Sequence, residues 1–119
     1  MTPKVHPSLP PTVKKIISAL EEKKGIDIVA LDVRELVSYT DHLVICSGSS
    51  SPHVNALVDG IRKVFSKQEG PLYVNPSKDD SWWILDFVEV VVHVFKESER
   101  DYYNLENLWG DAKKIGPID

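Results

Sequence analysis

The sequence predicts a single α/β domain in which helices pack on a mixed β-sheet. Two segments carry apolar residues at helical spacing, which indicates amphipathic helices. Short apolar segments rich in β-branched residues lie around them, as expected for strands. The longest apolar run, residues 82–95, has no 3.6-residue spacing and favours two paired strands. The predicted order of elements is α-β-β-α-(β)-β-β-α, without an internal repeat or a linker, which indicates a layered α/β architecture.

The chain is expected to begin with an arm and a helix. Residues 1–10 contain three prolines and predict an extended N-terminal arm. Pro11 suits the first turn of a helix, and Gly25 suits its end. The apolar stripe between them consists of Val13, Ile16, Ile17 and Leu20. The charged residues of this segment fall on the other side, as on a solvated helix face.

Two strands are expected next, at 26–33 and 42–46. In the first strand, alternation places Ile26, Ile28 and Ala30 on one side and Val29, Leu31 and Val33 on the other. In the second strand Cys46, the single cysteine, has no internal disulfide partner. We expect it to be a small buried hydrophobic residue of a protein from a reducing compartment.

The second predicted helix is the clearest element of the chain. Ser51 suits the N-cap and Pro52 the first helical position. Its apolar stripe consists of Val54, Leu57, Val58, Ile61, Val64 and Phe65. After it, Leu72–Val74 is expected to form a short edge strand.

The apolar run 82–95 is expected to be a hairpin with a tight turn near Val88 and Glu89. Its second strand is apolar on both faces, which is typical of a central, covered strand. In its first strand Trp83, Leu85 and Phe87 share one face, and Trp82, Ile84 and Asp86 share the other. An aromatic, an aliphatic and a charged residue together are more typical of a recognition surface than of a core.

A last helix is predicted after this hairpin. Ser98 and Asp101 have the spacing of an N-cap and its third helical residue, and Gly110 would end the helix. Its broad apolar side consists of Tyr102, Leu105, Leu108 and Trp109. The following residues show no periodicity, so we expect the domain to span 11–112 and a C-terminal tail to span 113–119.

Composition and motifs argue against several classes of function. A formal net charge of −4 disfavours nucleic-acid binding through phosphate neutralisation. The four histidines lack zinc-ligand spacing, and no P-loop or catalytic triad is present, so we expect no metal and no cofactor. The serine-rich turn 47–51 suits helix capping better than phosphate binding. No segment resembles a signal peptide or a membrane span, which predicts a soluble protein.

Several short motifs together resemble one known family. They are Asp27-Ile28-x-x-Leu31-Asp32, Thr40-Asp41, Ser47-Gly48-x-Ser50-x-x-His53-Val54, Trp82-x-x-x-Asp86, Val92-His93-Val94 and Arg100-x-x-Tyr103-x-Leu105-Glu106-x-Leu108-Trp109. In combination they closely resemble the ribosomal silencing factor family, also called RsfS or Iojap-like, from about Val13 to Trp109. One departure lies in the hairpin, where the family usually has a glycine and this chain has Val88. Because valine tolerates a positive φ poorly, the turn is expected either to differ in type or to be strained.

The resemblance implies a nucleotidyltransferase-like α/β fold without its catalytic apparatus, and no enzymatic activity. It also implies binding to the large ribosomal subunit through universal ribosomal protein fourteen, a block to subunit joining, and repression of translation when nutrients are short. The residues that match the family's motifs and the hairpin face suggest the partner-binding set: Trp82, Ile84, Asp86, His93, Arg100 and Tyr103. A net-acidic chain suits a basic partner of this kind.

Some alternatives stay open at this stage. Organellar relatives of the family are linked to ribosome assembly, which implies a role in large-subunit assembly instead of silencing. An active nucleotidyltransferase would use Ser49, Asp86 and Glu89. The expected location is the cytoplasm, with a plastid or mitochondrion as the alternative. The many large aromatic residues, together with the resemblance, suggest a homodimer.

Overall fold

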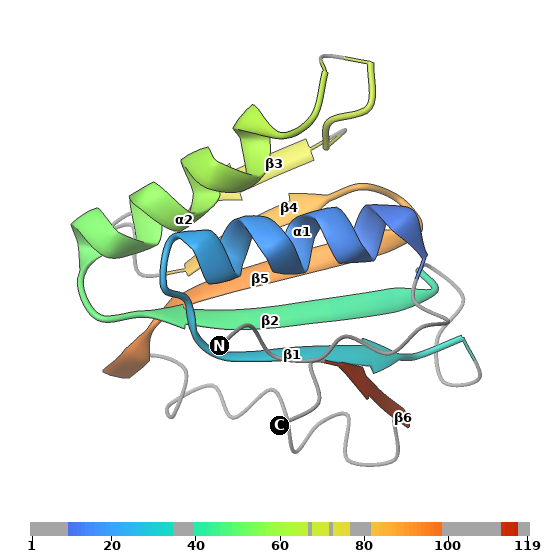
Figure 1. Ribbon diagram of the computed structural model, residues 1–119, viewed down its shortest axis with the longest axis horizontal. Coiled ribbons are helices and arrows are strands. Elements are labelled where there is room, and N and C mark those ends of the chain that lie inside the picture. Colours follow the sequence, from blue (N-terminus) through green and yellow to red (C-terminus); the bar gives the residue numbers. More distant parts are fainter. Residues whose placement is uncertain are drawn as a thin grey trace.

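The structure, a computed structural model, describes residues 10–34, 40–66, 68–71, 73–76, 82–98 and 113–116. Two helices lie on the same face of one sheet (Figure 1). The helices are α1 (Pro11–Glu22) and α2 (Ser51–Lys63). The strands are β1 (Ile26–Asp32), β2 (His42–Gly48), β3 (Tyr73–Pro76), β4 (Trp82–Asp86), β5 (Val90–Lys96) and β6 (Lys113–Gly116). The predicted α/β class with a mixed sheet is confirmed.

The sheet has six strands in the order β3-β4-β5-β2-β1-β6. The pair of β2 and β5 is parallel, and the other neighbours are antiparallel. The hairpin of β4 and β5 is confirmed, and β5 is an interior strand, as its two apolar faces predict. The short strand after α2 is also confirmed as an edge, at Tyr73–Pro76.

The start of α2 and the assignment of residues 113–116 differ from the expectation, beside shifts of one or two residues at the ends of β1, β2 and β3. The N-cap of α2 is Ser50 instead of Ser51, because the Ser50 backbone is extended (φ −156°) and its hydroxyl accepts from the His53 N–H at 3.3 Å. Residues 113–116, expected to belong to a tail, instead form β6 beside β1. A short edge strand forms because it pairs with a neighbouring strand. Four residues are too few for a periodic pattern to reveal such a strand.

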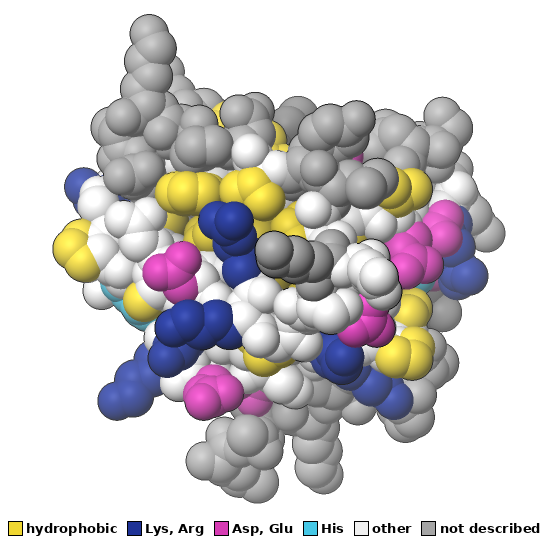
Figure 2. All heavy atoms as spheres, turned by 90° about the horizontal axis from the view of Figure 1, so that it is seen from above, with side chains coloured by type: hydrophobic (Ala, Val, Ile, Leu, Met, Phe, Trp, Pro, Cys, Tyr) yellow, Lys and Arg dark blue, Asp and Glu magenta, His cyan; other side chains and the backbone are white. Residues whose placement is uncertain are grey.

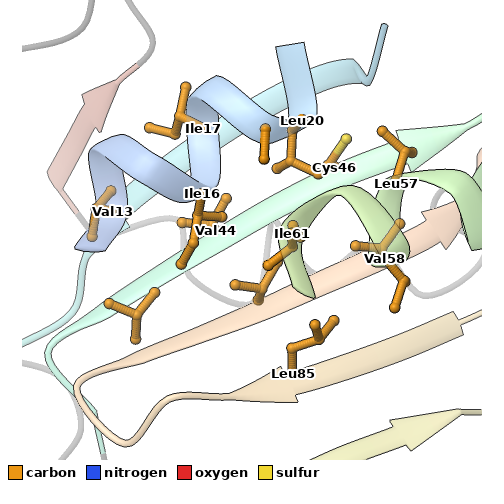
Figure 3. Packing of buried hydrophobic residues seen from close by; sticks show 14 of the residues in the cluster. Val13, Ile16, Ile17, Leu20, Val44, Cys46, Leu57, Val58, Ile61 and Leu85 are labelled. Carbon is orange, nitrogen blue, oxygen red and sulfur yellow. The ribbon is translucent and has the colours of Figure 1, made fainter. Parts of the chain in front are cut away.

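The main core lies between the helices and the sheet (Figure 3). The stripe of α1 and that of α2 as far as Ile61 are buried against the sheet, and Leu85, Val92 and Cys46 meet them from β4, β5 and β2. The predicted stripe of the second helix extended too far, because α2 ends at Lys63, Val64 is 41% exposed and Phe65 is only partly buried. Cys46 is fully buried, as expected of a small hydrophobic residue. Each large aliphatic side chain buried here contributes about 1.5–3 kcal/mol through the hydrophobic effect.

The other face of the sheet carries a second cluster of buried residues. Its members are Leu31, Val33, Leu43, Ile45, Val91 and Phe95. Trp82, Ile84 and Val29 are partly buried and pack against it. The face predicted to be a recognition surface is therefore also a packing surface, and Trp82 and Ile84 lie at its edge.

Several expectations fall outside the described residues. These are the N-terminal arm up to residue 9 and most of the last predicted helix, residues 99–110. Within the described ranges, no helix is long and apolar enough to cross a membrane.

Candidate functional site

Four of the six predicted partner-binding residues lie together on β4 and β5. Antiparallel pairing places Ile84 opposite His93, Trp82 opposite Phe95, and Asp86 opposite Val91. Residues directly opposite in a sheet point to the same face, so these side chains form one continuous surface. We call Trp82, Ile84, Asp86, His93 and Phe95 the aromatic face.

The Trp82 indole lies on this face over a second aromatic ring. Its ring centre is 4.9 Å from that of Phe95, with an interplanar angle of 25°, and 5.9 Å from that of His93. The His93 and Phe95 rings are also nearly parallel, at 9° and 6.1 Å. Because Phe95 is fully buried, it holds the base of the stack while Trp82 stays partly exposed.

His93 accepts a hydrogen bond from its aromatic neighbour. The Trp82 Nε1–H donates to His93 Nδ1 at 3.1 Å. An indole nitrogen can only donate, so Nδ1 must carry a lone pair and the ring proton of the neutral imidazole sits on Nε2. Burial lowers the pKa of His93 to about 4, which keeps the ring neutral near pH 7. Trp82 thus satisfies the acceptor nitrogen of a histidine that lies among apolar strand residues.

Asp86 ends β4 and also shapes the turn. Its Oδ1 accepts from the Val88 N–H at 2.8 Å. This contact uses one carboxylate oxygen and fixes the direction of the group. The sequence suggested Asp86 for partner binding and for the alternative nucleotidyltransferase site, but its part in the hairpin turn was not predicted.

The hairpin turn is strained at Val88. The Glu89 N–H donates to the Phe87 carbonyl at 3.0 Å, which closes a three-residue turn, and the central Val88 has φ 73°. A three-residue turn with a positive φ at its central residue is the rare, strained form of the γ-turn. A β-branched residue such as valine adopts a positive φ only at a cost. Of the two outcomes expected at Val88, strain is the one found.

Two predicted site residues, Arg100 and Tyr103, lie outside the described residues. One member of the aromatic face, Phe95, was not predicted as a site residue. The signal was available: a turn centred between Val88 and Glu89 pairs Phe95 with Trp82. The buried position of Phe95 at the base of the stack follows from that register.

The serine-rich turn before α2 has a structural role, as predicted. The Ser49 N–H donates to His53 Nδ1 at 2.8 Å, and His53 Nε2 donates to the Lys23 carbonyl at 2.9 Å, so His53 joins α2 to the end of α1. Gly48 is required because a Cβ there would lie 2.9 Å from the Val54 side chain. These contacts account for the motif from Ser47 to Val54 by packing and capping.

The residues of the alternative nucleotidyltransferase site do not come together. Ser49 follows the last residue of β2, whereas Glu89 precedes the first residue of β5. Since β2 and β5 run parallel and in register, these two residues lie at opposite ends of the sheet, roughly 26 Å apart at ~3.3 Å per residue. Asp86 lies at the Glu89 end. The three side chains named for that activity therefore form no common site.

Metal-ligating side chains of the described residues do not gather in one place, and one face of the molecule carries mixed charges. Among the described side chains, no group of three metal-ligating residues lies together. On the face drawn in Figure 2, cationic and anionic side chains of the described residues are interspersed without a broad basic patch. The aromatic face remains the part of the described molecule with the clearest features of a binding surface.

Comparison with known proteins identifies the family. The family model "Ribosomal silencing factor during starvation" matches residues 6–119. A ribosomal silencing factor RsfS of Bacillus subtilis is 38% identical over 84% of this chain and 86% of its own length. A mouse protein named "Mitochondrial assembly of ribosomal large subunit protein 1" is 32% identical over 82% of this chain, which spans 44% of that protein.

A solved structure agrees with these sequence relatives. The crystal structure of a Chromobacterium violaceum protein superposes with a TM-score of 0.78 at 33% identity, covering 83% of each chain. The resemblance found in the motifs is therefore confirmed over nearly the whole chain. This chain belongs to the ribosomal silencing factor family.

Proposed function

We propose that this chain binds the large ribosomal subunit and blocks its joining to the small subunit, which represses translation under nutrient limitation. The observation that carries the proposal is the aromatic face, where Trp82, Ile84 and His93 lie in register beside the Asp86 carboxylate. Family membership supports the ribosome as the site of action. The chain acts as a steric inhibitor, and its proposed role involves no catalysis and no cofactor.

The proposed contact on the ribosome is universal large-subunit ribosomal protein fourteen, a basic protein. Hot spots of protein interfaces are enriched in tryptophan and are surrounded by contacts that exclude water. Trp82 supplies the apolar anchor, and Ile84 extends it along β4. Asp86 has a second carboxylate oxygen beyond the one that accepts from Val88, and that oxygen is available to a lysine or arginine. Arg100 and Tyr103 complete the proposed contact set.

The net charge of −4 agrees with a basic protein partner and argues against direct binding to ribosomal RNA. We further propose that the chain acts in the cytoplasm and forms a homodimer. The observation behind the dimer is the number of large aromatic residues for a domain of this size, because a partly exposed set leaves room for a second copy.

A second candidate function is assembly of the large subunit. The name of the mouse relative favours it, since that protein is described as an assembly protein of mitochondria. An assembly factor would use the same surface and act in an organelle. The two functions differ in the ribosomal particle to which the chain binds: a mature large subunit for silencing and an immature one for assembly.

Subunit joining tests the proposal directly. Purified large subunits are incubated with the chain before small subunits are added, and the joined ribosomes are separated on a sucrose gradient. Silencing predicts fewer joined ribosomes as the chain is added, because the bound chain occupies the joining surface. Undiminished joining with saturating bound chain would contradict the proposal.

Purification of particles bound to the chain in cells separates the two candidates. Mature free large subunits favour silencing. Immature large subunits with unprocessed RNA or missing proteins favour assembly. A chain recovered without any large subunit contradicts both functions.

A further inference from the structure

We propose that His93 is a positioning residue of the aromatic face, which fixes the Trp82 indole through Nδ1 and does not contact the partner through its other ring nitrogen. The inference rests on the proposed function, since it concerns how the same surface is prepared for binding. It assigns different roles to two neighbouring rings: Trp82 is the contact, and His93 holds the contact in place.

The hydrogen bond supplies an orientation that stacking alone lacks. The last torsion of a tryptophan side chain has broad, weakly separated minima, so an indole over a flat ring can turn. A hydrogen bond from Nε1 to His93 Nδ1, at 3.1 Å, removes that freedom because the donor lies at one edge of the indole. Phe95 supports the ring from below, with an interplanar angle of 25° to the indole. The stack on Phe95 thus sets the distance of the indole from the sheet, and the hydrogen bond to His93 sets the rotation of the indole in its own plane.

His93 is suited to a permanent acceptor role. On this face its described neighbours are the apolar side chains of Ile84, Ile45 and Val91 together with the two aromatic rings. Asp86 lies diagonally across the β4–β5 pair and is the acidic member of the aromatic face. Burial keeps the pKa of the ring at about 4, so Nδ1 retains its lone pair near pH 7.

The arrangement also constrains the chemistry of the partner. The Trp82 Nε1–H already donates to His93 Nδ1, so the partner does not need to offer a hydrogen-bond acceptor to the indole. An indole side chain also suits contact with an aliphatic side chain or with the cation of a lysine or arginine. A basic partner surface therefore fits this geometry better than one that relies on an acceptor for the indole.

Two amide variants separate the roles of the two ring nitrogens. In His93→Asn, the amide oxygen takes the position of Nδ1 and can accept from the indole. In His93→Gln, the amide reaches the position of Nε2 instead. A positioning role through Nδ1 is therefore preserved by asparagine and lost with glutamine, and a direct partner contact through Nε2 gives the opposite order.

The first readout uses the free chain. Its three tryptophans give indole N–H signals in a ¹H–¹⁵N correlation spectrum, and Trp82→Phe identifies the signal of Trp82. We expect that signal to stay at its hydrogen-bonded, downfield position in His93→Asn and to move upfield in His93→Gln. An unchanged Trp82 signal in both variants would overturn the proposal without bearing on ribosome binding.

The second readout is co-sedimentation with purified large subunits. His93→Asn is expected to bind like the unsubstituted chain, and His93→Gln to bind about tenfold more weakly, as for loss of one hydrogen bond. Retained binding in His93→Gln with loss in His93→Asn, or equal binding by both, would overturn the positioning role. If the unsubstituted chain does not bind large subunits, the proposed function fails, and the indole signal still decides whether His93 orients Trp82.

Discussion

At the scale of single residues, Trp82 and Trp83 show how neighbours in a strand acquire different roles. Trp83 packs against the helix-facing core, and its buried Nε1 has no hydrogen-bond partner among the described residues. The Nε1 of Trp82 donates to His93 on the opposite face. A buried donor without a partner costs about 1–3 kcal/mol. The apolar packing of Trp83 against the core has to offset this cost.

The sequence predicted the faces of both tryptophans correctly because alternation along a strand has a fixed period of two. It did not predict the hydrogen bond to His93, since that contact joins two strands and depends on their register. It also placed the N-cap one residue late: Ser50 and Ser51 are the same residue type, and only the backbone conformation distinguishes them.

The depressed pKa of His93 predicts how stability depends on pH. The folded ring stays neutral down to about pH 4, while the unfolded ring takes up a proton near its ordinary value of 6.5. The unfolded state therefore binds more protons between these values, and the free energy of unfolding falls as pH is lowered through this window. The contribution of His93 is on the order of 2 kcal/mol, less than the full shift gives because part of the ring is exposed.

Urea unfolding at about pH 7 and about pH 4.5 measures this effect, with His93→Asn as the control that cannot titrate. Other groups titrate in both chains, so the comparison isolates His93. The unsubstituted chain should lose more stability than the control between the two values. An equal loss in both would show that His93 does not stay neutral in the folded chain.

At the scale of elements, the β4–β5 hairpin combines a correctly predicted pairing with a strained turn. The residue pattern predicted both strands and the position of the turn. The conformation of the turn follows from three hydrogen bonds: Glu89 to the Phe87 carbonyl, Val88 to Asp86, and Phe87 to the Val90 carbonyl. Val88 has a positive φ in this turn, and this backbone conformation costs of order 1–3 kcal/mol.

Replacing that valine should stabilise the fold. Val88 is 54% exposed, so Val88→Gly loses little packing and removes the positive-φ strain. After the greater backbone entropy of glycine in the unfolded chain is subtracted, we expect a gain of about 1 kcal/mol. Thermal unfolding of the variant measures it.

Glu89→Gly is the matched control for this turn, since Glu89 is exposed and does not have a positive φ. It adds the entropy of glycine without relieving strain, so it should destabilise by about 0.5–1 kcal/mol. A loss of stability in both variants would mean that the turn is not strained at Val88.

The β6 strand shows where element prediction from sequence ends. Lys113–Gly116 has no alternation and is rich in residues uncommon in strands, so the sequence favoured a tail. Its partner β1 supplies the pairing, with Asp32 opposite Lys113 and Leu31 opposite Lys114. Such pairing depends on distant residues, and local pattern carries no information about it.

At the scale of the whole molecule, the sheet has buried clusters on both faces, and the two described helices cover one of them. The sequence predicted this layered architecture and the burial of β5, because apolar stripes and two-faced apolar strands are strong signals. It described the Trp82 face as a recognition surface only. The second cluster means that Trp82 serves both packing and the proposed binding, so loss of Trp82 affects both properties.

The central claim is that the face of Trp82, and not that of Trp83, binds the ribosome. Trp83→Ala should destabilise the fold by about 3 kcal/mol, at the low end for a large aromatic residue because Trp83 is only partly buried. Trp82→Ala should also lower stability, since the indole packs on Phe95. Both variants are therefore expected to lose stability, but only Trp82→Ala is expected to lose binding.

Co-sedimentation of both variants with purified large ribosomal subunits, at a temperature where melting curves show each to be folded, is the most direct test. We expect Trp82→Ala to weaken binding by about 2 kcal/mol or more, roughly thirtyfold, and Trp83→Ala to bind like the unsubstituted chain. Normal binding by Trp82→Ala, or loss of binding by Trp83→Ala alone, would contradict the central claim.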